Sequence, residues 1–226
     1  MRARIERQNE QRKLMLTGIS HDLRTPLTRL RLGLSMLSPD LPPDPDEIAA
    51  MERDVAEMGA MIDAFLDHAR AEAQDGAPEA VEAREFLDES VAAAQRGGHL
   101  VRLVDFQTGA GGGQLVVRVQ ALRRAIENLI ANAVRHGTKV EIAARLTPRS
   151  FAVTVEDDGP GIPPERREEA LRPFVRLDSA RSRNQGQGAG LGLAIAADIA
   201  RAHGGELRLG DSARLGGLKA EIVLPR

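Results

Sequence analysis

Two long series of apolar residues dominate the first 70 residues of the chain. Their members recur every three or four positions, the spacing that places side chains along one face of a helix. The first series comprises Leu16, Ile19, Leu23, Leu27, Leu30, Leu34 and Leu37, and the second comprises Ile48, Met51, Val55, Met58, Ile62, Phe65 and Ala69. The pattern therefore predicts two helices, each with one apolar seam.

The segment between the two series, SPDLPPDPDE, predicts a turn. Its four prolines cannot continue a helix, so the two helices should form a hairpin. A lone hairpin buries too little apolar surface, and hairpins with such seams commonly pair into a four-helix bundle. We therefore expect a homodimer.

The pattern changes after residues 74–80 (QDGAPEA), which we interpret as a linker. Segments typical of strands lie at 101–106, 115–119, 140–146, 151–156, 206–210 and 218–224. Segments typical of helices lie at 83–95, 119–137 and 190–205, and the last two end in glycine. We interpret the Gly-rich stretch 109–113 as a hairpin loop. This order predicts an α+β multidomain protein, with a helical hairpin at 1–73 and, at 81–226, a sandwich whose helices cover one face of a sheet.

Composition narrows the functional classes. The 226 residues are 42% hydrophobic, enough for cores of their own, and the net charge of −2 provides no broad positive field for nucleic acid. The absence of Trp and Tyr removes the usual aromatic platforms for single strands. The absence of Cys excludes disulfides and thiolate metal sites, and no run of about 18 apolar residues predicts a membrane span.

The first candidate reactive group is His21, in the segment ISHDLRTPLT. It falls outside the apolar series, so we expect it to face solvent. Asp22 can accept a hydrogen bond from one imidazole nitrogen and leave the other free as a nucleophile, and Thr25 lies one turn away. Pro26 removes a helix hydrogen bond and permits a bend. A lone histidine would be an ordinary exposed side chain, but these neighbours favour a reactive site.

A candidate base-reading group, Asp157, occurs in VEDDGPGI after a strand pattern. Gly159 and Gly161 would let a flat ligand approach the backbone closely. A carboxylate suits adenine, because adenine presents an exocyclic amine where guanine presents an oxygen. A lone motif of this kind is also typical of an acidic turn.

A candidate phosphate-binding segment, GQGAGLGLAI, places Gly186, Gly188, Gly190 and Gly192 before and into a helix. Such an arrangement offers backbone N–H groups and the positive end of the helix to phosphate. The segment lacks the Lys-Ser/Thr ending of a P-loop and the context of a dinucleotide-binding fold, so both commoner motifs fit poorly.

The segment ENLIANAVRHG places Asn128 and Asn132 one helical turn apart, followed by Arg135 and His136. Amide oxygens are suitable ligands for Mg²⁺, and arginine is a good partner for phosphate. The alternative is a solvated polar helix face.

In this order SHDLRTPLT, ENLIANAVRHG, DDGPGI, RPFVRLDSAR and GQGAGLGLAI resemble the H, N, G1, F and G2 boxes of sensor histidine kinases. The resemblance extends from about residue 10 to the end. It implies a dimeric helical hairpin followed by a GHKL-type (Bergerat) ATP-binding α/β sandwich. The stretches HDLRTPLTRLRL, PFVRLDSARS and SARLGGL resemble in particular the EnvZ-like osmosensor kinases, which pair with OmpR-type response regulators.

The resemblance also implies a role for each matching residue. In the hairpin, His21 would accept the phosphoryl group, Asp22 would orient the imidazole, and Thr25 would position water for dephosphorylation of the partner. In the sandwich, the nucleotide-binding set implied by the resemblance comprises Asn128, Asn132, Arg135, His136, Asp157, Gly159, Gly161, Phe174, Arg176, Gly188, Gly190, Leu191 and Gly192. Within that set, Asn132 would bind Mg²⁺, Asp157 would read adenine, Phe174 and Arg176 would belong to a mobile lid, and the later glycines would close over the phosphates.

The implied activity is ATP-dependent phosphorylation of His21, transfer to an Asp of a response regulator, and dephosphorylation of that regulator. Because the family carries a sensor region, membrane helices and a HAMP relay, we expect this chain to be the cytoplasmic end of a longer receptor in the bacterial inner membrane. The proline-rich hairpin turn departs from the family pattern. Two alternatives stay open: a GHKL ATPase that forms no phosphohistidine, and a dimeric scaffold without catalysis. The presence of Asn132, Asp157 and the four glycines argues against the scaffold.

Overall fold

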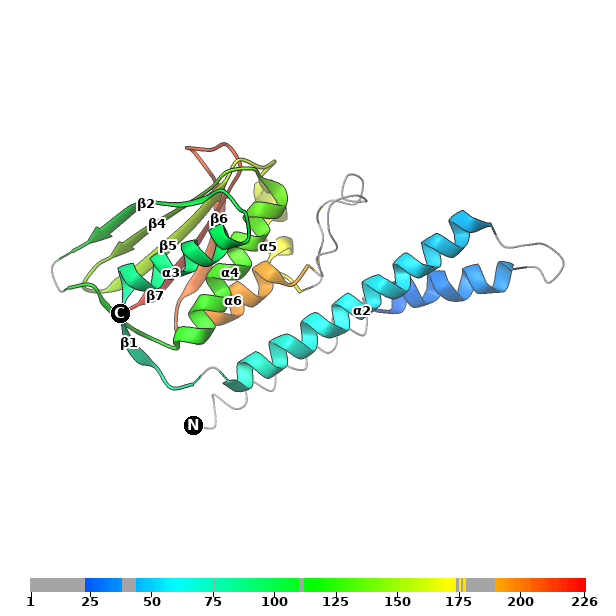
Figure 1. The fold of residues 1–226 in the computed structure, drawn as a ribbon, viewed down its shortest axis with the longest axis horizontal. Helices are drawn as coiled ribbons and strands as arrows, with labels where there is room; N and C mark the ends of the chain where they lie inside the picture. Colours follow the sequence, from blue (N-terminus) through cyan, green and yellow to red (C-terminus); the bar gives the residue numbers. More distant parts are fainter. Residues whose placement is uncertain are drawn as a thin grey trace. The chain divides into compact units, whose positions relative to one another are not determined.

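The computed structural model describes residues 23–37, 44–74, 76–109, 112–173, 175, 177 and 190–226 (Figure 1). Contacts within the chain divide it into two units, with the boundary between Asp67 and His68. Among the helices of these described ranges, none is long and apolar enough to cross a lipid bilayer.

The first unit contains a helix over residues 23–36 and most of α2 (Pro45–Gln74). Asp44 explains where α2 begins. Its Oδ1 accepts a hydrogen bond from the Asp46 N–H at 2.9 Å, and its carbonyl accepts from the N–H groups of Glu47 and Ile48. Pro45 follows at the first helical position, where its missing N–H costs nothing.

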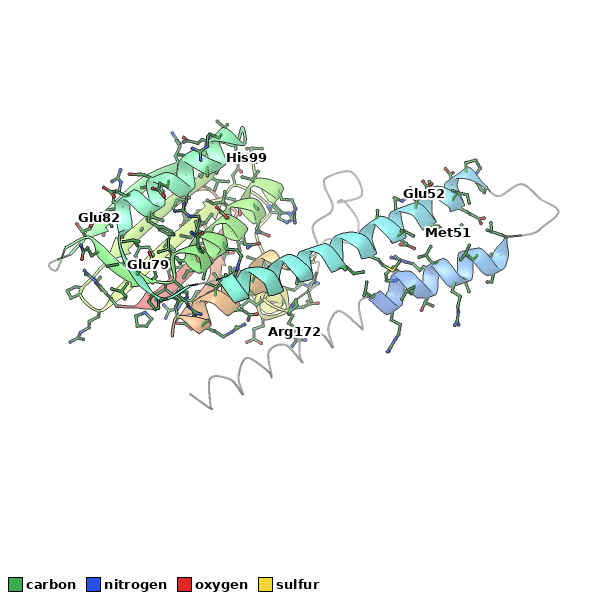
Figure 2. The ribbon with its side chains drawn as sticks, turned by 60° about the horizontal axis from the view of Figure 1, so that its bottom comes forward. Met51, Glu52, Glu79, Glu82, His99 and Arg172 are labelled. Atoms are coloured by element: carbon green, nitrogen blue, oxygen red, sulfur yellow. The ribbon has the colours of Figure 1, made fainter. Side chains whose placement is uncertain are left out.

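Two contacts join these helices as an antiparallel pair. Gly33 lies so close to α2 that a Cβ on it would fall 3.2 Å from the sulfur of Met51, which Figure 2 labels. One turn earlier on the first helix, Arg29 forms an ion pair of 2.7 Å with Asp54, one turn later on α2. The predicted hairpin is therefore confirmed for the described residues.

Most described residues of the two apolar seams fall into two sets, each with members seven positions apart, although Ile48, seven positions before Val55, is half-buried and departs from this pattern. One set is half-buried within the hairpin: Leu23, Leu30, Leu37, Met51 and Met58. The other set remains 45–60% exposed: Leu27, Leu34, Val55 and Ile62. We call these four residues the open seam. A single hairpin covers only half of its apolar face, which leaves surface for further helices.

The second unit is built on a five-stranded sheet in the order β2-β4-β5-β7-β6. Its strands are β2 (Val101–Thr108), β4 (Val140–Leu146), β5 (Ser150–Asp157), β6 (Glu206–Asp211) and β7 (Leu218–Pro225). The β2–β4 pair is parallel and the other pairs are antiparallel, so the sheet is mixed. A separate antiparallel pair joins β1 (Glu79–Glu82) to β3 (Gln114–Val117).

Helices α3 (Ala83–Arg96), α4 (Val119–His136) and α6 (Gly192–Ala202) cover one face of the sheet (Figure 1). A short 3-10 helix, Pro164–Arg166, leads into α5 (Arg167–Ala170). Alternate strand residues such as Ile142, Val153 and Ile222 are fully buried against the helices. Polar residues such as Thr154 and Glu221 lie between them on the other face, so the predicted sandwich with helices on one side is confirmed.

The structure corrects three details of the prediction. The stretch 109–113 is not a hairpin loop, because β2 pairs with β4 and β3 pairs with β1 in a different sheet. The strand predicted at 115–119 ends at Val117, since Val119 already begins α4. Strand β1 begins at Glu79, within the segment interpreted as a linker. Pairing partners depend on tertiary contacts that a local pattern does not contain.

Candidate functional site

The candidate site is centred on Asp157, the last residue of β5. Only 2% of its surface is exposed, and its Oδ1 accepts hydrogen bonds from the N–H groups of Gly159 at 2.9 Å and Leu218 at 3.1 Å. Burial raises the pKa of this carboxyl above its ordinary 3.8, although the two backbone donors oppose the shift. In the described part of the chain, Oδ2 has no hydrogen-bond partner, so it is available to a ligand donor.

Three glycines make close packing around Asp157 possible. A Cβ on Gly159 would lie 2.6 Å from the His136 carbonyl, and a Cβ on Gly217 would lie 2.5 Å from the Asp157 carbonyl. Gly137 has an extended backbone, yet a Cβ there would lie 2.6 Å from Oδ1 of Asp158. At these positions glycine is needed for space rather than for an unusual φ.

Gly161 is needed for its conformation. Its φ is +68°, and its backbone lies near Gly217. The loop after β5 therefore runs beside the turn that leads into β7. Gly161 therefore sets the course of the loop after Asp157, and its role in nucleotide binding stays a prediction.

Asp158 anchors the connection between α4 and β4. Its Oδ1 accepts from the N–H groups of Thr138 at 2.6 Å and Lys139 at 2.9 Å, and its Oδ2 bonds the Thr138 hydroxyl at 2.7 Å. These donors lower the pKa of Asp158 to about 2. Asp158 therefore carries a negative charge at neutral pH and holds the end of α4 beside Asp157.

The carboxyl-terminal half of α4 contributes the polar residues predicted from ENLIANAVRHG. Asn128 and Asn132 are half-buried, and Arg135 and His136 are exposed. The Asn128 amide donates to the Arg124 carbonyl at 2.8 Å, whereas the Asn132 side chain has no hydrogen-bond partner among the described residues. The Asn132 amide oxygen is thus available for a ligand or a metal ion.

The beginning of α6 lies against α4. A Cβ on Gly192, the first residue of α6, would lie 3.3 Å from the Asn128 side-chain oxygen. Gly190 has φ +68°, and Leu191 is buried between these glycines. The predicted placement of glycines before and into a helix is therefore observed for the described part of the segment.

Of the predicted hairpin residues, Thr25 is exposed on the helix of residues 23–36. Six other predicted residues lie outside the described ranges: His21, Asp22, Phe174, Arg176, Gly186 and Gly188. The structure thus brings Asp157, its glycines and the end of α4 together, and it describes neither the proposed phosphoacceptor nor the proposed lid.

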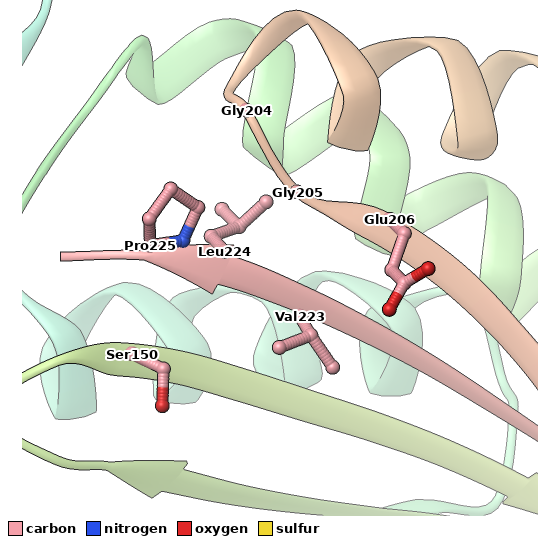
Figure 3. Close-up of a pocket in the computed structure, with 7 residues that line it drawn as sticks. All are labelled: Ser150, Gly204, Gly205, Glu206, Val223, Leu224 and Pro225. Atoms are coloured by element: carbon pink, nitrogen blue, oxygen red, sulfur yellow. The ribbon is translucent and has the colours of Figure 1, made fainter.

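A pocket of about 410 Å³ lies at the opposite end of β5 from Asp157 (Figure 3). Its lining comprises Ser150, Gly204, Gly205, Glu206, Val223, Leu224 and Pro225. Glu206 is the one charged side chain in that lining, which disfavours an anionic ligand such as a triphosphate. The nucleotide hypothesis therefore concerns the Asp157 end of the sheet.

The sequence reasoning missed three contributors to the site: Asp158, Gly137 and the turn before Leu218. Two features of the sequence could have indicated them, the consecutive carboxylates Asp157–Asp158 and the consecutive glycines Gly216–Gly217. Their partners could not be predicted, because Leu218 is 61 positions from Asp157 along the chain.

The assembled groups have a definite chemical capacity. Oδ2 of Asp157 can accept a hydrogen bond from an exocyclic amine. Two backbone donors to Oδ1 hold the carboxylate in place. The Asn132 amide oxygen suits a hard cation that is otherwise held by phosphate and water. No group of three His, Asp or Glu side chains able to hold a metal ion occurs in the ranges that the structure covers.

Comparison with known proteins gives the family. Residues 117–226 match the family described as histidine kinase-, DNA gyrase B- and HSP90-like ATPase, and residues 11–74 match the His Kinase A (phospho-acceptor) domain. The sensor histidine kinase CpxA of Escherichia coli is 36% identical over 98% of this chain and 48% of its own length. The chain spans about half the length of the curated relatives it matches.

The solved structure of one histidine kinase ATP-binding domain agrees with this match. The ATP-binding domain of PrrB from Mycobacterium tuberculosis is 28% identical, covers 66% of this chain and 98% of its own, and superposes with a TM-score of 0.51. The histidine kinase domain of the E. coli osmosensor EnvZ is 34% identical over 66% of this chain and 90% of its own, with a TM-score of 0.48. With a phosphoacceptor domain and an ATPase domain in sequence, the chain belongs to the sensor histidine kinases.

Proposed function

We propose that this chain is the catalytic core of a histidine kinase that phosphorylates His21 from ATP and passes the phosphoryl group to an Asp of an OmpR-type response regulator. The observation that carries the proposal is that Oδ2 of buried Asp157 has no hydrogen-bond partner among the described residues, whereas its Oδ1 is saturated by the N–H groups of Gly159 and Leu218. This oxygen accepts from the adenine amine, and it would repel the oxygen of guanine.

In the proposed reaction, one nitrogen of the neutral His21 imidazole attacks the γ-phosphorus of ATP. A P–N bond forms, the bond from phosphorus to the β-phosphate oxygen breaks, and ADP leaves. The phosphoramidate then donates its phosphoryl group to a carboxylate of the regulator, which breaks the P–N bond and restores the imidazole. Catalysis in such transfers depends mostly on positioning and on charge neutralisation.

Each proposed residue has one task in this scheme. Asp22 accepts from the second imidazole nitrogen and keeps the attacking nitrogen unprotonated. Arg135 and the Gly188–Gly192 segment bind the phosphates, with Asn128 beside them, and His136 lies beside the nucleotide. Phe174 and Arg176 belong to the covering lid. Thr25 positions the water that dephosphorylates the regulator.

The donor set fits Mg²⁺. Asn132 offers an amide oxygen with no hydrogen-bond partner in the described part of the chain, and Mg²⁺ in nucleotide sites is held by few protein ligands plus phosphates and water. Bound there, the ion would neutralise charge on the phosphates. Asn132→Ala is therefore expected to abolish labelling and to leave the fold intact.

The open seam supports a homodimer. Leu27, Leu34, Val55 and Ile62 would be covered by the same residues of a second hairpin in a four-helix bundle. We further propose that residues 1–73 form the dimerisation and phosphotransfer domain, that 74–80 link it to the catalytic domain 81–226, and that the whole protein is a receptor of the bacterial inner membrane with this part in the cytoplasm.

Incubation with γ-labelled ATP tests the function. Wild type should acquire label that acid removes and alkali does not, and His21→Gln should acquire none. Asp157→Asn is the matched control: it retains His21 but should acquire little label, because its nucleotide binding is weakened. Persistent label in His21→Gln would contradict the phosphoacceptor assignment.

The two alternatives give different results in the same assay. A GHKL ATPase would release phosphate without covalent label, and this release would survive in His21→Gln. A scaffold would fail to bind an ATP analogue at all. Either result would replace the proposed kinase activity.

A further inference from the structure

The turn between β6 and β7 forms one wall of the Asp157 site. It comprises residues 212–217, and at its end the Leu218 N–H donates to Oδ1 of Asp157 while the Gly217 N–H donates to the Asp157 carbonyl at 3.1 Å. Any displacement of the turn would therefore remove a donor from the carboxylate and change the space beside it.

Hydrogen bonds within the turn fix its shape. The Ser212 N–H donates to the Gly217 carbonyl at 2.8 Å, and the Ser212 hydroxyl accepts from the Leu215 N–H at 3.0 Å. Gly216 supplies a positive φ of +88°. These bonds keep the turn compact, but they do not hold it against the rest of the site.

A first external clamp on the turn is Arg167, at the start of α5. Its Nε donates to the Ile162 carbonyl at 3.0 Å, and its Nη2 lies 2.5 Å from Oδ1 of Asp211, the last residue of β6. The Arg167 side chain is only 19% exposed. One guanidinium thus joins the loop that follows Asp157 to the strand end from which the turn begins.

A second clamp reaches the turn from the other face of the sheet. Arg214, within the turn, donates to Oε2 of Glu141 at 2.6 Å. Glu141 is 9% exposed on β4, and its Oε1 also accepts from Arg102 of β2 at 3.3 Å. Because a nearly buried carboxylate needs partners, Glu141 provides a firmer anchor than an exposed one would.

We propose that Arg167 and Arg214 are positioning residues for base recognition: through Asp211 and Glu141 they hold the β6–β7 turn so that Leu218 and Gly217 stay against Asp157. The inference rests on the proposed function, because it takes Asp157 as the reader of adenine. Each ion pair has one largely exposed partner, Asp211 at 75% and Arg214 at 53%, which limits its contribution to global stability, so the effect should appear chiefly in nucleotide binding and selectivity.

Matched controls exist for both clamps. Arg102→Ala removes the other partner of Glu141 without touching the turn. Arg208→Ala removes an arginine that pairs with Glu206 at the far end of β6. Arg102→Ala is matched to Arg214→Ala, because both variants remove a guanidinium from Glu141. Arg208→Ala is matched to Arg167→Ala, because both variants remove the partner of a carboxylate on β6.

The test measures binding of ADP and GDP to the full chain, by competition with a ribose-labelled ADP, together with the thermal midpoint without nucleotide. Arg167→Ala and Arg214→Ala should each weaken ADP binding by about threefold to tenfold, leave GDP binding and the midpoint unchanged, and so reduce the preference for adenine. Asp211→Asn and Glu141→Gln should reproduce these losses from the other side of each pair. Both controls should stay within about twofold of wild type.

A second readout excludes a purely structural effect. Because the Leu218 N–H lowers the pKa of Asp157, a displaced turn should move the acidic limit of ADP binding to higher pH in the clamp variants and not in the controls. The inference fails if a clamp variant keeps the wild-type ratio of ADP to GDP affinity, or if the controls lose as much. Wild type without any preference for ADP would instead contradict the proposed function itself.

Discussion

Thr138 gives both its backbone N–H and its hydroxyl to the carboxylate of Asp158, at 2.6 and 2.7 Å. Together with the Lys139 N–H, these donors tie the residues after α4 to the end of β5. The neighbouring Asp157 accepts from other donors, the N–H groups of Gly159 and Leu218, so the two consecutive carboxylates have different roles. Asp158 holds the backbone, and Asp157 presents Oδ2, which has no hydrogen-bond partner in the ranges that the structure describes.

Asp158 should make stability fall in acid. Its pKa is lowered to about 2 from an ordinary 3.8, so its contribution is present above 3.8 and is lost as the pH falls towards 2. Asp158→Ala should unfold at lower urea than wild type at pH 6, and the difference should shrink by pH 2.5. Asp158→Asn keeps an acceptor for both N–H groups and should fall between the two. A difference that grows on acidification would contradict the assignment.

Asp157→Asn should separate binding from folding. The new amide can still accept from Gly159 and Leu218, but it turns an N–H₂ towards the ligand, where adenine also has a donor. ADP affinity should fall by roughly 10-fold to 100-fold, the range for a lost hydrogen bond to a charged group. The thermal midpoint at pH 7 should equal or exceed that of wild type, because a buried charge is removed. Unchanged ADP binding by calorimetry would exclude Asp157 as the base reader.

Nucleotide binding should weaken on acidification at a higher pH than the titration of an ordinary Asp, whose pKa is 3.8. Burial raises the pKa of Asp157, and only the ionised carboxylate lacks a competing proton. ADP affinity should therefore decline as the pH falls through a value above 3.8, and Asp157→Asn should lack this decline. His136 also lies near Asp157, so His136→Ala serves as the control and should retain it.

The open seam predicts a selective effect on assembly. Leu34→Glu should weaken the dimer by at least about tenfold, because a charge in an apolar interface costs on the order of 1–3 kcal/mol or more. Leu32 is equally exposed, at 63% against 60%, but lies outside the seam, so Leu32→Glu is the matched control. Light scattering across a dilution series measures both. Equal dissociation of the two variants would count against the four-helix bundle.

Thr25→Ala should retain phosphorylation of His21 and lose most dephosphorylation of the regulator, because the exposed hydroxyl is proposed to position water. Thr28 provides the control, since its hydroxyl is already engaged with the Arg24 carbonyl at 2.8 Å. Thr28→Ala should keep both activities. Release of phosphate from a prephosphorylated regulator distinguishes the variants, and parallel loss of both activities in Thr25→Ala would refute the division of roles.

Much of the fold follows from local pattern. Strand β4 has the predicted bounds, because every second residue of VEIAARL from Val140 to Leu146 is apolar, and all four of these residues are buried. Strand β1 was missed because only Val81 among its four residues is even half-buried, which leaves no period to detect. The partner of β2 was also unpredictable, since parallel pairing with β4 spans a whole helix.

The candidate site was predictable in its residue types and less so in its connections. Asp157 could be identified because its motif occurs in order with four other motifs of the resembled family, whereas the motif alone is also typical of an acidic turn. Its second donor, Leu218, could not, because it arrives by strand pairing at the opposite end of the domain sequence. The same limit hid Arg167 and Arg214, whose partners are fixed only after the sheet has formed.

The saturation of one oxygen of Asp157 has a consequence for inhibitor chemistry. A competitive heterocycle needs a single donor directed at Oδ2, and a second donor aimed at Oδ1 would find its acceptor already occupied by backbone. If Asp157 reads adenine as proposed, a substitution of Asp157 that prevents inhibitor binding should also weaken ATP binding, since both molecules would bind the same oxygen.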